Sequence, residues 1–225
     1  MNGLALVASC VIGLAVTGCA SNPDPRDDPD YLRWVAFRSI VGKENLLLRW
    51  RRDQMPLKVH VMQAPEGLFD QPADIHEAIL DGILNWSDVI ETGVPTFTFV
   101  QDPADADIPV VWEEEPVGGF SVAQCVYHIN IEQHRFGVSR ILMTGRWAGD
   151  RVASKEEIYR VMLHEMGHAL GLAGHSPNDN DIMGRRGIRW MERPGITLRD
   201  RTTMRLLYER PIGTRMSGAK RESYR

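Results

Sequence analysis

The segment HEMGHALGLAGHS, residues 164–176, constrains this 225-residue chain more than any other part of it. On an α-helix each residue turns about 100°, so His164 and His168, four residues apart, lie about 40° apart on one face. The helix around them is apolar nearly all round, as a buried helix is, through Ile158, Val161, Met162, Leu163, Met166, Ala169 and Leu170. Unpaired buried polar groups cost several kcal/mol. The two histidines and Glu165 therefore need partners, which a zinc ion or other protein groups would supply.

Glu165 follows His164 directly and is expected to point to the side of the metal. Zinc lowers the pKa of a water that it binds to about 7, so a carboxylate beside it can act as general base at neutral pH. Gly171 is expected to end the helix in a left-handed conformation, which turns the chain back beneath the metal. The segment therefore predicts a zinc site with hydrolytic chemistry.

Residues 164–171 resemble the metzincin metallopeptidases, and within them the matrixin-like group, whose pattern is H-E-x-x-H-x-x-G-x-x-H. Gly174 stands where the pattern has its third histidine, and His175 comes one residue later. In matrixins a serine follows this histidine and a methionine comes eight residues after it, as Ser176 and Met183 do after His175. We therefore interpret Gly174 as one extra residue that lengthens the turn, and His175 as the ligand.

The resemblance implies that His164, His168 and His175 hold one catalytic zinc ion, with Glu165 as general base and Met183 as a hydrophobic floor below the ligands. It implies an α+β, zincin-like catalytic domain with a twisted mixed sheet, two long helices and a C-terminal helix. The resemblance covers about residues 56–210 and implies a zinc endopeptidase that cleaves protein or peptide substrates. Residues 140–145, and the loop from Met183 to Gly195, are expected near the substrate cleft.

The pattern of the chain predicts elements in the same order. LKVHV, from Leu57, alternates like a half-buried strand. A helix from Pro72 to Gly93 is predicted by apolar residues at helical spacing, and Ser154 and Thr197 are predicted to cap two further helices. Four more segments predict strands, among them QCVYHIN as a short edge strand: residues 96–100, 108–112, 124–130 and 140–145.

The N-terminus predicts export and a lipid anchor. Residues 1–18 carry no charged side chain, and their apolar run is too short to span a membrane. The end of this run, AVTGC, resembles a bacterial lipobox, which makes Cys19 the lipidated residue. Residues 19–30 are expected to form a flexible tether, residues 31–55 to pack on the domain rather than touch lipid headgroups, and residues 211–225 to form a polar tail.

Composition limits the partners. A net charge of −4 provides no basic excess for nucleic acid, and Cys125 is expected to be a buried hydrophobe.

We expect a monomer in the bacterial cell envelope, anchored to the outer membrane. A second zinc or a calcium site around His128, His134 and Glu113–Glu115 is left open, as is the control of activity, since no cysteine-switch motif is visible. The alternative function is a non-catalytic zinc-binding lipoprotein with a structural or binding role.

Overall fold

The structure, a computed structural model, describes residues 25–38, 45–87, 89, 95–114, 122–130, 135–147, 149–184 and 195–216. Its main sheet has five strands in the order β4-β3-β5-β7-β6. The strands are β3 (Leu57–Val61), β4 (Phe97–Phe99), β5 (Ile108–Trp112), β6 (Ala123–Asn130) and β7 (Arg135–Met143). All neighbours are parallel except β6, which runs antiparallel to β7 and forms one edge of the sheet. The predicted mixed sheet is confirmed, and QCVYHIN lies in its edge strand.

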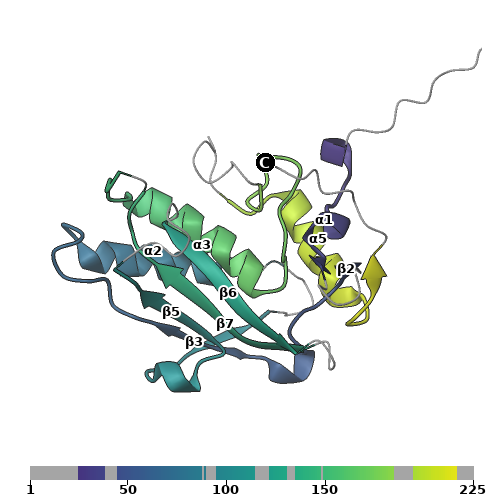
Figure 1. The fold of residues 1–225 in the computed structure, drawn as a ribbon, viewed down its shortest axis with the longest axis horizontal. Helices are drawn as coiled ribbons and strands as arrows, with labels where there is room; N and C mark the ends of the chain where they lie inside the picture. Colours follow the sequence, from purple (N-terminus) through teal and green to yellow (C-terminus); the bar gives the residue numbers. More distant parts are fainter. Residues whose placement is uncertain are drawn as a thin grey trace, which may run out of the picture.

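Among the described elements, the two long helices cover one face of this sheet. Along β3, Leu57 and Val59 are fully buried while Lys58 between them is exposed, which is the alternation of a strand with one face on the core. The helices α2 (Pro72–Leu84) and α3 (Lys155–Ala169) pack on the buried face and against each other (Figure 1). Their approach is close, because a side chain at Gly82 would lie 2.8 Å from the Met162 Cβ.

The helix α2 is shorter than its apolar pattern predicts. Pro72 occupies the first turn as expected, but the helix ends at Leu84 with Asn85 as its C-cap. Trp86, which continues the helical spacing in the sequence, is buried after the helix and donates from its indole N–H to the Leu163 carbonyl. The expected stop at Gly93 lies outside the described residues.

Both predicted capping boxes are present. Ser154 caps α3 with Glu157, and Thr197 caps α5 (Leu198–Glu209) with Asp200. A capping box satisfies two backbone N–H groups that the first turn leaves free. The starts of the helix that carries the histidines and of the C-terminal helix are thus both encoded locally.

The two ends of the described chain lie together beside α5. Residues 31–36 form α1 (Leu32–Val35) and its flanks, which join the main hydrophobic core and contact α5 (Figure 1). A small sheet combines β1 (Phe37–Arg38), β2 (Asn45–Leu46) and β8 (Arg215–Met216). Residues 215–216, which the sequence assigns to a polar tail, therefore pair with β2. The described residues also include three short 3-10 turns: η1 (Pro25–Asp27), η2 (Arg52–Gln54) and η3 (Pro103–Asp105). In the described part of the chain, no helix has the length and apolarity that a membrane crossing requires.

Candidate metal centre

Three histidines converge at the end of α3. One ring nitrogen from each of His164, His168 and His175 lies within 4.8 Å of those of the other two. The ring centroids are 4.7 to 5.2 Å apart. His175 comes from the loop after α3, so the extra residue at Gly174 does not keep it away from the cluster. Among the described residues, these three form the one group of histidine, cysteine or acidic side chains that could share a metal ion.

Backbone carbonyls orient two of the rings. The Nδ1 of His164 lies 2.7 Å from the Ile182 oxygen, and the Nδ1 of His168 lies 2.6 Å from the Leu172 oxygen. A carbonyl only accepts, so each Nδ1 carries the hydrogen and each Nε2 keeps its lone pair. Burial, and then the neighbouring His175, lowers the pKa of His164 to about 3. Neutral imidazoles fixed in this tautomer fit a zinc ion.

Gly171 makes the turn that joins the two parts of the cluster. The helix ends at Ala169, and Gly171 has a φ of 118°, a conformation that favours glycine. A side chain there would also lie 2.6 Å from the Leu48 oxygen. Gly174 is not among the described residues with a positive φ, so the extra residue is absorbed by an ordinary backbone conformation.

Met183 lies against the helix between the two histidines. It is fully buried, and a side chain at Gly167 would lie 2.4 Å from its sulfur. Its carbonyl accepts from the Ser176 N–H at 2.8 Å, which joins Met183 to the residue after His175. Residues 185–194, which include most of the loop expected near the substrate cleft, lie outside the described residues.

Glu165 is held against the edge strand. It is 7% exposed, and its Oε2 accepts from the backbone N–H of Cys125 at 2.7 Å. Burial raises the pKa of Glu165 to about 8, while this hydrogen bond acts in the opposite direction. The strand that contacts Glu165 is therefore β6. Arg140–Met143, predicted to lie near the cleft, belong to β7, which lies between β5 and β6 inside the sheet and is therefore not an edge strand.

Cys125 also places its side chain near Glu165. Burial, and then the negative charge of Glu165, raises the pKa of the thiol well above its usual range. A protonated thiol is a poor metal ligand and a poor nucleophile. What Cys125 provides to the site is its backbone N–H.

Two buried aspartates behind the site were missed from the sequence. Asp181, in the loop before Met183, is 2% exposed, and it accepts from the Ser176 hydroxyl and from Arg199. Asp200, expected only as a helix cap, is fully buried and accepts from the Ile182 N–H at 3.0 Å. The sequence shows the capping box of Thr197 and Asp200. Nothing in the sequence indicates that Asp200 is buried beside Ile182.

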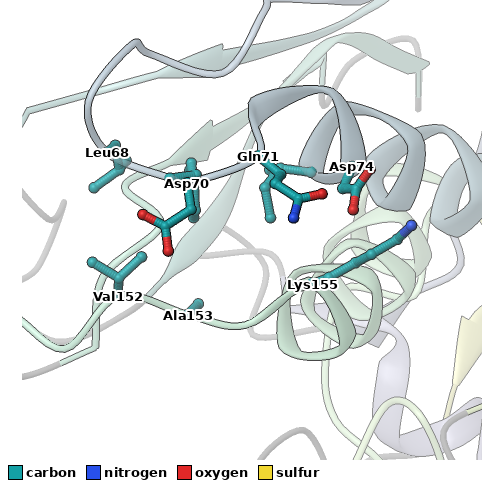
Figure 2. Close-up of a pocket in the computed structure, with 9 residues that line it drawn as sticks. Leu68, Asp70, Gln71, Asp74, Val152, Ala153 and Lys155 are labelled. Atoms are coloured by element: carbon teal, nitrogen blue, oxygen red, sulfur yellow. The ribbon is translucent and has the colours of Figure 1, made fainter.

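The second metal site that the sequence left open gains no support from the described residues. His128 is exposed on β6 and belongs to no such cluster, and His134 and Glu115 lie outside the described residues. A separate cavity of about 330 Å³ opens between the start of α2 and the start of α3 (Figure 2). Lys155 at its rim precedes His164 by nine residues, roughly 14 Å along the helix, so this cavity is distinct from the histidine cluster.

Comparison with known protein families gives a match. A family model described as matrixin matches residues 49–209, most of the chain, and includes every residue of the cluster. No curated protein matches the sequence.

Proposed function

Since the chain belongs to the matrixin family of metallopeptidases, we propose that it is a zinc-dependent endopeptidase that cleaves peptide bonds within protein or peptide chains. The observation that carries the proposal is the convergence of three imidazoles, two of them held by carbonyls in the tautomer that leaves Nε2 free. His164, His168 and His175 would hold one zinc ion. When bound there, zinc supplies a Lewis acid that polarises the peptide carbonyl and makes water more acidic.

Glu165 is the proposed general base. Its carboxylate accepts a proton from the water that attacks the peptide carbonyl, and returns a proton to the amine as the carbon–nitrogen bond breaks. The Cys125 N–H occupies its Oε2, which fixes the carboxyl group and leaves Oε1 for the water. A cation nearby lowers the pKa of a carboxyl group, so the metal-loaded protein favours the ionised form that this role requires.

The edge strand β6 offers a place for the substrate. An extended peptide can add to an exposed sheet edge through main-chain hydrogen bonds, and β6 has a partner strand on one side only among the described strands. A substrate bound along β6 would pass Cys125 and hence Glu165.

The test is zinc content together with cleavage of a denatured protein by the purified protein and by its Glu165→Gln variant. We expect cleavage to fall by about 10²–10⁴-fold in the variant, because it lacks the base, while zinc stays near one per chain. Glu156→Gln, an exposed change on the same helix, should alter neither. Loss of zinc from Glu165→Gln would show that Glu165 is a ligand. A wild-type protein that binds zinc without cleavage would favour the non-catalytic alternative.

We also propose the arrangement of the whole chain. Residues 1–18 would be the signal peptide and Cys19 the lipidated residue, both outside the described residues. The tether expected over residues 19–30 would end before Arg26, because Arg199 donates to the Arg26 and Asp28 carbonyls. The segment 31–55 would then precede a catalytic domain over about 56–210. The protein would act as a monomer on the bacterial outer membrane, with proteins or peptides as substrates. The support is the sequence of the N-terminus.

A further inference from the structure

The segment Arg26–Phe37 lies outside the part of the chain that matches the family, yet it packs beside the metal centre. Tyr31, Leu32 and Val35 are each at most 3% exposed, and α1 contacts α5 (Figure 1). The Tyr31 backbone N–H donates to the Thr203 hydroxyl of α5 at 3.0 Å. The segment is therefore part of the folded domain, and what it contacts there can be followed to the histidines.

Tyr31 leads to His164 through two residues. Its hydroxyl donates to Oδ1 of the buried Asp200. Burial, followed by the charge of Asp200, raises the pKa of the Tyr31 phenol well above its usual range, so the hydroxyl keeps its proton. The Oδ2 of Asp200 accepts from the Ile182 N–H at 3.0 Å, and the Ile182 carbonyl accepts from His164 Nδ1 at 2.7 Å. Asp200 thus holds Ile182, the residue whose carbonyl orients the first ligand.

Other contacts of the segment reach the loop of the third histidine. The Val35 carbonyl accepts from the Ala173 N–H at 2.9 Å, two residues before His175. Arg199 donates to the backbone carbonyls of Asp28 and Arg26, and its Nε lies 2.9 Å from Oδ2 of Asp181. Asp181 in turn accepts from the hydroxyl of Ser176, which follows His175.

We propose that Arg26–Phe37 is a positioning element of the metal centre, in which Tyr31, acting through Asp200 and Ile182, orients the His164 ring and thereby sets the affinity for zinc. This inference rests on the proposed function, since it takes the three histidines as zinc ligands. Tyr31 touches neither metal nor substrate. Its contribution is the fourth donor to Asp200, beside the Ile182 N–H and the N–H and hydroxyl of Thr197.

Tyr31→Phe removes this one hydroxyl, and Tyr208→Phe is its matched control. Both tyrosines are at most 1% exposed. An arginine lies over each ring: Arg199 over Tyr31 and Arg49 over Tyr208. The Tyr208 hydroxyl donates to the Leu170 carbonyl at 3.1 Å, and no described contact connects it to residues 181–183. The two variants lose the same group from similar surroundings, but only one loses a link to Ile182.

The experiment measures zinc dissociation constants of the full-length protein by competition with a chelator, well below the unfolding temperature, and the visible spectrum of the Co²⁺-loaded forms. Partners of a ligand histidine typically change metal affinity by 10–100-fold. Tyr31 is two residues beyond Ile182, the direct partner of His164, so we expect the low end of that range, about a tenfold weaker affinity, and a shifted Co²⁺ spectrum for Tyr31→Phe. For Tyr208→Phe we expect less than a twofold change and an unshifted spectrum.

Two results would overturn the inference: an affinity and spectrum for Tyr31→Phe that match wild type, or equal losses in both variants, which would indicate general destabilisation. Neither result concerns the proposed function, which depends on the wild-type protein. A wild-type protein that binds no zinc would remove both proposals together.

Discussion

At the scale of single residues, the third histidine shows how a one-residue insertion is accommodated. Gly171 turns the chain with its positive φ, and the loop then brings His175 to the other two rings. The residues after it stay in register, because the Ser176 N–H pairs with the Met183 carbonyl. The insertion therefore changes the length of the turn but not the set of side chains that meet.

We predict that His175→Ala lowers both zinc affinity and activity by more than 100-fold. This is a larger effect than the roughly 10–100-fold losses typical of groups that hydrogen-bond to a ligand histidine. A catalytic zinc ordinarily has three protein ligands, and the variant retains two. Deletion of Gly174 should keep zinc and some activity, since Ser176 and Met183 would shift together with His175. Metal analysis and peptidase assays measure both effects. His128→Ala, an exposed histidine on β6, is the control and should resemble wild type. Full zinc in His175→Ala would mean that another residue completes the site.

Gly167 is a second residue whose size matters. Alanine is favoured over glycine inside a helix by about 1 kcal/mol, but a Cβ at Gly167 would lie 2.4 Å from the buried Met183 sulfur and 3.2 Å from Trp86. We predict that Gly167→Ala lowers the free energy of unfolding by about 1–3 kcal/mol and weakens zinc binding, as urea unfolding and chelator competition would measure. Adding Met183→Ala should make the two losses less than additive. Increased stability of Gly167→Ala would contradict this packing.

The sequence identified the cluster residues but not the groups that support them. The two histidines four residues apart and Glu165 can be recognised in the sequence alone. Polar residues at this spacing in an otherwise apolar helix are most simply explained by a zinc site. Asp181 and Asp200 carry none. An aspartate in a loop and an aspartate in a capping box are ordinarily solvated, whereas the tertiary structure, in which α1 packs against α5, buries both.

At the scale of elements, α3 depends on the local interactions at its start. Glu157 completes the capping box and accepts from both terminal nitrogens of Arg151, at 2.9 and 2.7 Å. The Arg151 hydrogen bonds lower the pKa of Glu157 to about 2, against 4.5 for a free glutamate. A pKa that folding lowers contributes stability above the unfolded value, and this contribution is lost as the pH falls towards the folded value.

We therefore predict that Glu157→Gln destabilises the zinc-free protein by about 1 kcal/mol at pH 7, a modest value because Arg151 is half exposed. The amide oxygen of glutamine can still accept from Ser154, so the variant removes mainly the charge. The difference from wild type should shrink as the pH falls below 4.5 towards 2, and urea unfolding at pH 7 and pH 3.5 would measure it. Glu209→Gln, in an exposed pair with Arg205, should have a smaller effect. A difference that is constant with pH would exclude the charge as its cause.

Among the elements, those with local signals were predicted and those without were not. The capping boxes of α3 and α5 and the alternation of β3 are written in neighbouring residues, so their starts agree with the structure. The end of α2 was placed too late, because Trp86 keeps the helical spacing while its indole is held by the Leu163 carbonyl of another helix. The strand β8 has two residues, and only its pairing with β2 defines it.

At the scale of the whole molecule, the proposed anchor determines where the protein works. We predict that wild type fractionates with membranes and that Cys19→Ser yields soluble or unprocessed protein, since the acyl chains are the proposed anchor. Cys10→Ser is the matched control, because the apolar run before Cys10 is too short for a signal peptide; this variant should remain in the membrane fraction. Wild-type protein in the soluble fraction would exclude the anchor.

The contact of Arg199 with the carbonyls of Arg26 and Asp28 also limits how far an anchored molecule could move. With the chain attached to the domain from Arg26 onward, six residues lie between Arg26 and Cys19. The seven steps from Cys19 to Arg26 span at most about 3.6 Å each, or roughly 25 Å in an extended chain. Diffusion would then be confined to a thin layer parallel to the bilayer. Encounters would be frequent with proteins that share this layer, through the high effective concentration that a short tether creates, and rare with proteins in the bulk solution beyond it.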